Sequence, residues 1–148
     1  MTPRKELFTK VKEELLKIPE LELIELQRKQ FSSGKDNYPD FYTVALIEIK
    51  SITWTAMVQQ KQEGKCTIDI HFYCKDGWVN PDLIEIDIVD KIVEKLQGLH
   101  GDQFTPLHHS LEEPGNETEE IMSYKLSFET SMYMSDTKYT YKKIKLTM

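Results

Sequence analysis

The feature that most constrains this fold is a pair of segments in which apolar and polar residues alternate on either side of Gln62-Glu63-Gly64. The apolar positions of the first segment are Ile52, Trp54, Ala56 and Val58, and those of the second are Cys66, Ile68, Ile70, Phe72 and Cys74. A period of two is typical of strands with one buried face, and a short polar connection containing glycine joins antiparallel neighbours. The two segments therefore predict a long antiparallel hairpin.

The second strand of this hairpin also has a polar face. Its members are Thr67, Asp69, His71, Tyr73 and Lys75. Such a set is polar enough to face solvent or to form a wet interface, and the sequence alone leaves both interpretations open.

Two amphipathic helices are predicted, one before and one after the hairpin. The first begins at Thr2-Pro3 and ends before Pro19, and the second begins at Asn80-Pro81-Asp82 and ends at Gly98. Each start combines a capping residue with a first-turn proline, and glycine is a common helix stop. Apolar residues recur at helical spacing in both segments, so each helix is expected to pack one face on a sheet.

Further strands are predicted over residues 21–26, 42–49, 104–111 and 121–133. Residues 42–49 are almost continuously apolar, as in a central strand covered on both faces. The slip in alternation at Leu23-Ile24 indicates a bulge, and Pro106 indicates an edge strand or a bulge. A loop is expected over residues 31–40 and a turn over residues 112–116. We therefore predict a single α+β domain over residues 1–148, with a mixed, mainly antiparallel sheet of about five to six strands and two amphipathic helices packed on it.

Composition limits the class of protein. Hydrophobic residues make up 39% of the chain, no apolar run approaches the roughly 20 residues that cross a bilayer, and the N-terminus lacks the pattern of a signal peptide. We therefore expect a soluble cytoplasmic protein. Cys66 and Cys74 would lie about 27 Å apart along one strand at ~3.4 Å per residue, so we predict two buried free thiols.

The net charge of −6 argues against specific nucleic-acid binding, which requires a basic face. One exception is the segment 138–145, in which lysines and tyrosines are interleaved. This segment fits a single-stranded nucleic-acid contact or, more commonly, a solvated edge strand protected by lysines.

No pattern of catalytic or metal-binding residues is found. The chain lacks a nucleophile elbow, phosphate-binding glycine loops and a His-Glu-x-x-His motif. His108 and His109 would point to opposite faces of a strand, and His71 and His100 have no partner at a known ligand spacing. We expect no metal, no cofactor and no catalytic residue.

The order of elements is helix, strand, loop, three sheet strands, helix, and then two or three strands. Within it, Tyr38-Pro39 leads into Val44-Ala45-Leu46-Ile47-Glu48-Ile49, and Lys95-Leu96-Gln97-Gly98 precedes Phe104-Thr105-Pro106-Leu107. In these features the chain resembles a small prophage family, the tail-terminator or tail-completion components of long-tailed phages. The similarity spans most of the chain, rests on short structural motifs and carries over no catalytic residue.

The resemblance implies a ring-forming subunit, usually hexameric, that caps the tail tube and offers a surface to the head connector. Its partners would be copies of itself, tail-tube proteins and head-connector proteins, in the bacterial cytoplasm or the virion. We expect the contacts at the loop 31–40, the hairpin tip 59–65 and the tail 137–148, because strand addition and docking use exposed loops and unpaired edges. The candidate interface residues are Tyr38, Trp78, Gln62, Lys65, Tyr139, Tyr141 and Lys143.

Two other functions stay open at this point. A monomeric adaptor domain would bind a protein or peptide at one exposed sheet edge or groove. A small enzyme would bring titratable groups from distant positions together in one pocket.

Overall fold

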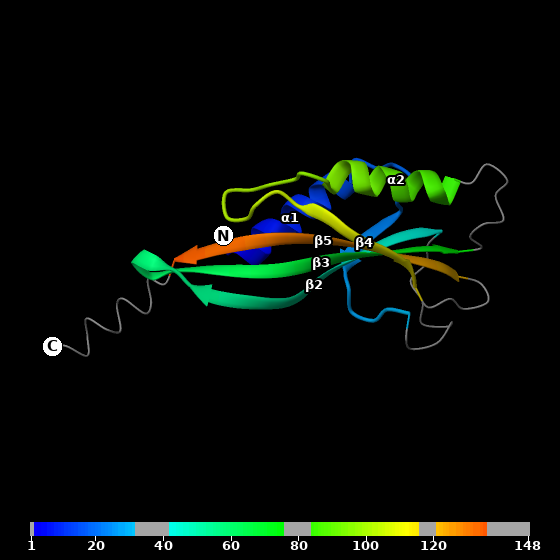
Figure 1. Cartoon of the computed structure of the whole chain (residues 1–148). Helices are drawn as coiled ribbons and strands as arrows, with labels where there is room; N and C mark the ends of the chain where they lie inside the picture. Colours follow the sequence, from blue (N-terminus) through cyan, green and yellow to red (C-terminus); the bar gives the residue numbers. More distant parts are fainter. Residues whose placement is uncertain (1, 32–41, 76–83, 116–120, 136–148) are drawn as a thin grey trace.

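The computed structural model describes residues 2–31, 42–75, 84–115 and 121–135. These residues form a five-stranded sheet and two helices (Figure 1). The elements are α1 (Pro3–Leu15), β1 (Leu23–Leu26), β2 (Thr43–Ala56), the 3-10 turn η2 (Val58–Gln60), β3 (Lys61–Lys75), α2 (Ile84–Leu96), β4 (His108–Pro114) and β5 (Ile121–Ser135). The strand order is β1-β2-β3-β5-β4, with β1 parallel to β2 and the other neighbours antiparallel. The predicted α+β class is confirmed.

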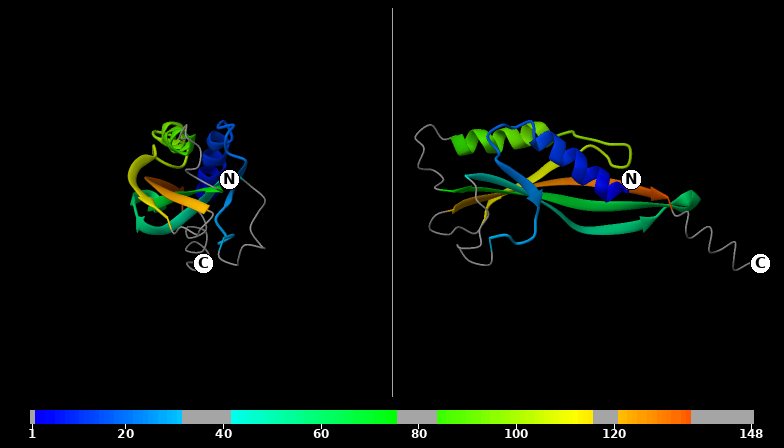
Figure 2. Two further views of the ribbon diagram at one scale, coloured as in Figure 1. Left: turned by 90° about the vertical axis from the view of Figure 1, so that its right-hand side faces the viewer. Right: turned by 180° about the vertical axis from the view of Figure 1, so that it is seen from behind.

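Both helices lie on the same face of the sheet (Figure 1, Figure 2). Their apolar residues pack against alternate residues of the strands in one core, whose largest fully buried members include Leu7, Leu15, Ile88, Ile92, Ile68, Ile70, Phe72 and Phe128. Within the described residues no helix covers the opposite face. The fold therefore presents one covered and one open face of the same sheet.

The first helix has a local cap, and the segment after it is held by contacts with the start of β2. The Thr2 hydroxyl accepts a hydrogen bond from the Lys5 N–H at 3.3 Å, which is the predicted cap. Beyond the helix, the Thr43 hydroxyl donates to the Glu20 carbonyl and accepts from the Glu22 N–H at 3.2 Å. These bonds tie the segment before β1 to the start of β2. Thr43 is 2% exposed, so losing either bond would leave a buried polar group without a partner.

The bulge predicted at Leu23-Ile24 is wrong. β1 pairs with residues Val44–Ile47 without a register shift. Ile24 points into the main core, whereas Leu23 joins a smaller apolar cluster with Val44 on the other face of the sheet. Two adjacent apolar residues thus reflect a strand with apolar neighbours on both faces rather than a bulge.

The segments 42–49 and 52–58, predicted as separate strands, form the single strand β2. The pairing with β3 shifts register between Ile49 and Ile52, where β2 contains a bulge. A bulge moves the buried positions by one residue, so Ile47 and Ile49 face the helices before it and Ile52 and Trp54 after it. The slip in period at this point therefore marks a bulge within one strand and not a boundary between two strands.

The hairpin itself is confirmed, but its tip is shorter than predicted. The turn is η2, in which Gln59 adopts a left-handed conformation with φ 62°, and β3 begins immediately after it at Lys61. Residues 61–65, predicted to be part of the tip, are therefore strand residues; all of them pair with β5, and residues 62–65 also pair with β2. Their polar character had suggested a loop.

The second half of the chain agrees with prediction in β5 and α2 and differs in β4. Gly98, with φ 80°, follows α2 and confirms the predicted helix stop, while the predicted start at 80–83 lies outside the described residues. β4 is an edge strand with a register shift between His109 and Leu111, as the proline pattern indicated. It begins later than predicted, and residues Glu112–Pro114, predicted to lie in a turn, pair with β5.

Both cysteines are free and buried, as predicted. Burial raises the pKa of the Cys66 thiol to about 11. The thiol is therefore protonated at neutral pH and is not a nucleophile.

A glycine in β3 leaves room for the ring of Trp54. Gly64 lies directly opposite Trp54, and an added Cβ would come within 2.7 Å of the Trp54 ring and 2.8 Å of Ile52 Cγ2. We expect Gly64→Ala to lower the free energy of unfolding by about 1–3 kcal/mol, measured by urea denaturation. In a Trp54→Ala background the same change should cost clearly less, and an equal cost would show that the ring is not the obstacle.

Candidate interaction surfaces

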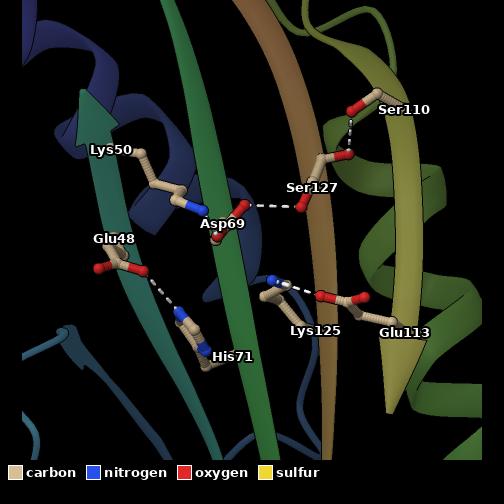
Figure 3. Close-up of polar contacts among 8 residues, drawn as sticks. All are labelled: Glu48, Lys50, Asp69, His71, Ser110, Glu113, Lys125 and Ser127. Carbon is tan, nitrogen blue, oxygen red and sulfur yellow. Dashed lines mark hydrogen bonds and ion pairs between the residues drawn. The ribbon is translucent and has the colours of Figure 1, made fainter. Parts of the chain in front are cut away.

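The open face of the sheet carries a cluster of charged side chains, which we call the polar cluster (Figure 3). It consists of Glu48, Lys50, Asp69, His71, Glu113, Lys125 and Ser127. These residues come from four strands, because positions opposite one another in register point to the same face. The predicted polar face of β3 is part of this surface.

Asp69 is the most enclosed member of the polar cluster, with 1% of its surface exposed. The Ser127 hydroxyl donates to Asp69 Oδ1 at 2.6 Å, and Lys50 Nζ lies 3.5 Å from Oδ2. The prediction that this position faces solvent or a wet interface is wrong for Asp69, because the neighbouring side chains cover it. Ser127 is held in turn by a bond from the Ser110 hydroxyl to its carbonyl at 3.2 Å.

Two further contacts between basic and acidic side chains surround Asp69. His71 Nε2 lies 2.8 Å from Glu48 Oε1, and Lys125 Nζ lies 2.5 Å from Glu113 Oε1. The hydrogen bond to Glu113 raises the pKa of Lys125, and the charges of Asp69 and Glu48 act in the same direction. Each lysine of the cluster thus faces a carboxylate, which leaves little positive charge for phosphate groups.

Sequence reasoning missed the polar cluster because its contacts cross strands. Glu48 and His71 are 23 residues apart and Asp69 and Ser127 are 58 apart, so no local spacing relates them. His71 was expected to lack partners for a metal site. That expectation is wrong, because the register of β2 on β3 places His71 beside two carboxylates.

A pocket of about 330 Å³ borders the cluster on the same face. It is lined by Gln27, His71 and Tyr73 and by residues 113–115 and 123–125. Burial raises the pKa of Tyr73, whose ring packs on Phe31 with centroids 4.3 Å apart. Two of the residues that line the pocket contact carboxylates, His71 with Glu48 and Lys125 with Glu113.

A second surface is the outer edge of β2. β1 pairs with β2 only as far as Ile47, and no described strand lies beside residues 51–56, which we call the free edge. The Met57 N–H donates to the Lys61 carbonyl at 2.8 Å, which shows which residues of β2 are hydrogen-bonded to β3 and which are not. Because bonded residues alternate in an antiparallel pair, the N–H and C=O groups of Ile52, Trp54 and Ala56 point away from β3.

The composition of this edge is unusual for the chain. Residues 51–60 contain no charged residue, although 30% of the whole sequence is charged and ten residues would carry about three on average. Natural edge strands are commonly protected by lysine, proline, bulges or short length. This uncharged run was the sequence signal for the free edge, and it only becomes meaningful once the strand is known to lie at an edge.

The opposite edge of the sheet, β4, is protected. It contains a bulge between His109 and Leu111, the acids Glu112 and Glu113, and Pro114, which has no N–H to donate. Its neighbour β5 is also covered beyond β4, because Thr105 and Tyr133 form backbone hydrogen bonds with Ser131 and Gln103. The free edge of β2 is therefore a better template for strand addition than the edge formed by β4.

The free edge ends at an exposed apolar tip. The side chains of Met57, Val58 and Tyr133 are 42%, 82% and 38% exposed. The tip projects past both helices (Figure 1). Val58 is the most exposed of the large apolar side chains in the described part of the chain.

The structure places two of the predicted interface residues near these surfaces. Gln62 is part of β3 opposite Ala56, and Lys65 lies on the open face beside a shallow groove lined by Ser51, Thr53 and Thr67. Both belong to a strand, whereas the sequence predicts a loop tip at these positions. The other five candidates lie outside the described residues: Tyr38, Trp78, Tyr139, Tyr141 and Lys143.

A comparison with models of known protein families gives no match, and a comparison with curated proteins gives none either. In the described part of the chain no helix is both long enough and apolar enough to cross a membrane.

Proposed function

We propose that this chain is a structural subunit that assembles with copies of itself, as part of a phage-tail-like assembly. In this proposal it acts as a tail-terminator or tail-completion ring that joins the tail tube to the head connector, in the bacterial cytoplasm or in the virion. The phage context comes from the resemblance in sequence. The observation that carries self-assembly is the free edge of β2 with its uncharged residues and apolar tip.

The free edge supports assembly for a physical reason. Outward N–H and C=O groups gain hydrogen bonds when another strand adds, and the uncharged side chains oppose neither approach nor burial. The tip would bury Met57 and Val58 against a neighbour and contribute about 25 cal/mol for each Å² of apolar surface removed from water. Edge and tip together form a contact region on one side of the sheet.

The charges of the polar cluster support a function in which this face of the sheet does not bind nucleic acid. Its lysines are paired with Asp69 and Glu113, and the net charge of the chain is −6. In a ring whose channel is lined by this face, DNA could pass without binding to fixed cations.

The free edge would also accept an extended peptide, which is the adaptor function. Sedimentation velocity of the purified full chain over a wide concentration range separates the two. The assembly proposal predicts a species larger than the monomer whose fraction rises with concentration. A monomer at every concentration would overturn it, and an accompanying capture of extended peptides at the free edge would favour the adaptor.

A further inference from the structure

Glu48, Asp69 and His71 bring three metal-binding side chains together on the open face (Figure 3). Glu48 on β2 and Asp69 on β3 are directly opposite in register, and His71 is two residues farther along β3, on the same face. One ligand atom of each residue lies within 4.8 Å of those of the other two. The sheet itself thus fixes the relative positions of the three groups.

Two acids directly opposite each other in a sheet repel one another and need a cation between or beside them. Asp69 is 1% exposed, and its Oδ2 atom is buried without a hydrogen bond, although Oδ1 accepts one from Ser127. Lys50 Nζ, 3.5 Å from Oδ2, is on a side chain that is 47% exposed and can move into solvent. The buried carboxylate oxygen is therefore available to a stronger cation than the ammonium group.

We propose that Glu48, Asp69 and His71 bind one divalent transition-metal ion, with zinc as the ion of best fit. Carboxylate oxygen and imidazole nitrogen are common zinc ligands, whereas magnesium and calcium prefer oxygen alone. On binding, the ion displaces Lys50 from Asp69 and replaces the hydrogen bond of 2.8 Å between His71 and Glu48. Three protein ligands leave a fourth position for water on the solvent side.

The surroundings of Asp69 are suited to this role. The Ser127 hydroxyl orients the carboxylate from behind at 2.6 Å, which is the kind of outer hydrogen bond that holds metal ligands in place. Lys125 lies nearby, but it is paired with Glu113 at 2.5 Å. Glu48, at 39% side-chain exposure, provides the route of entry from solvent. The ion would cross-link β2 and β3 at the middle of the sheet.

Isothermal titration of the full chain with zinc chloride tests the proposal, with cobalt(II) absorption as an independent report of ligand type. We expect one zinc per chain with a Kd in the micromolar range. His71→Gln should weaken binding at least about tenfold, since it removes the only nitrogen ligand. Lys50→Gln should tighten binding several-fold, because it removes the competing cation. Magnesium should compete poorly.

His108→Gln is the matched control, because His108 is exposed and lies outside the cluster. It should bind zinc as the unmodified chain does, and circular dichroism should show His71→Gln to be folded. Zinc affinity that is the same with and without His71 would overturn the site, as would a folded chain that takes up no zinc at micromolar concentrations. The cluster would then be a network of ion pairs and nothing more.

Discussion

Replacing Phe72 by alanine should lower the free energy of unfolding by about 3–5 kcal/mol, the largest effect on stability that we expect from a single substitution in this chain. Phe72 is fully buried in β3, between Ala45 of β2 and Tyr124 of β5 and beneath the helices. Its removal leaves a cavity in the core between the helices and the sheet. In thermal unfolding the change corresponds to a fall in Tm of roughly 6–20 °C for a domain of this size.

Ile86→Ala is the matched control for this prediction. Ile86 is also a large apolar residue, but it lies on α2 with 44% of its surface exposed. Its truncation should change the free energy of unfolding by about 0.5 kcal/mol or less. Similar losses for Phe72→Ala and Ile86→Ala would contradict the position of the core between helices and sheet.

Those parts of the fold that depend on local signals could be predicted from the sequence. The Thr2 cap, the glycine stop at Gly98 and the long alternations in β3 and β5 each involve residues close in the chain, and the structure agrees with them. The bulge in β2 could not be placed, because a change of period at Ile49 looks the same whether a strand bends or ends. Leu23-Ile24 were misread for a related reason, since both faces of β1 have apolar neighbours.

The polar cluster and the free edge were not predictable in the same way. Glu48, Asp69 and Ser127 meet only because β2, β3 and β5 pair in one register, and a shift of one residue would turn each side chain to the other face. The free edge can be recognised only when the order of the strands in the sheet is known. Polar residues such as Gln62 suggested a turn, but in β3 they are paired on both sides and contribute no unpaired backbone.

The central claim is that the free edge of β2 joins one copy of this chain to another. Ala56→Pro tests it, because proline removes the outward N–H of Ala56 while leaving intact the bonds of β2 to β3 that involve Thr55 and Met57. Ala56→Ser is the matched control, since it changes the same side chain and keeps the N–H. Circular dichroism and thermal unfolding should first show that both variants are folded.

The decisive measurement is native mass spectrometry of the three proteins at one concentration at which the unmodified chain is assembled. We predict oligomers for the unmodified chain and for Ala56→Ser, and predominantly monomer for Ala56→Pro, because strand addition at the edge loses a hydrogen bond and is blocked by the proline ring. Oligomers of the same size and abundance in folded Ala56→Pro would contradict the claim.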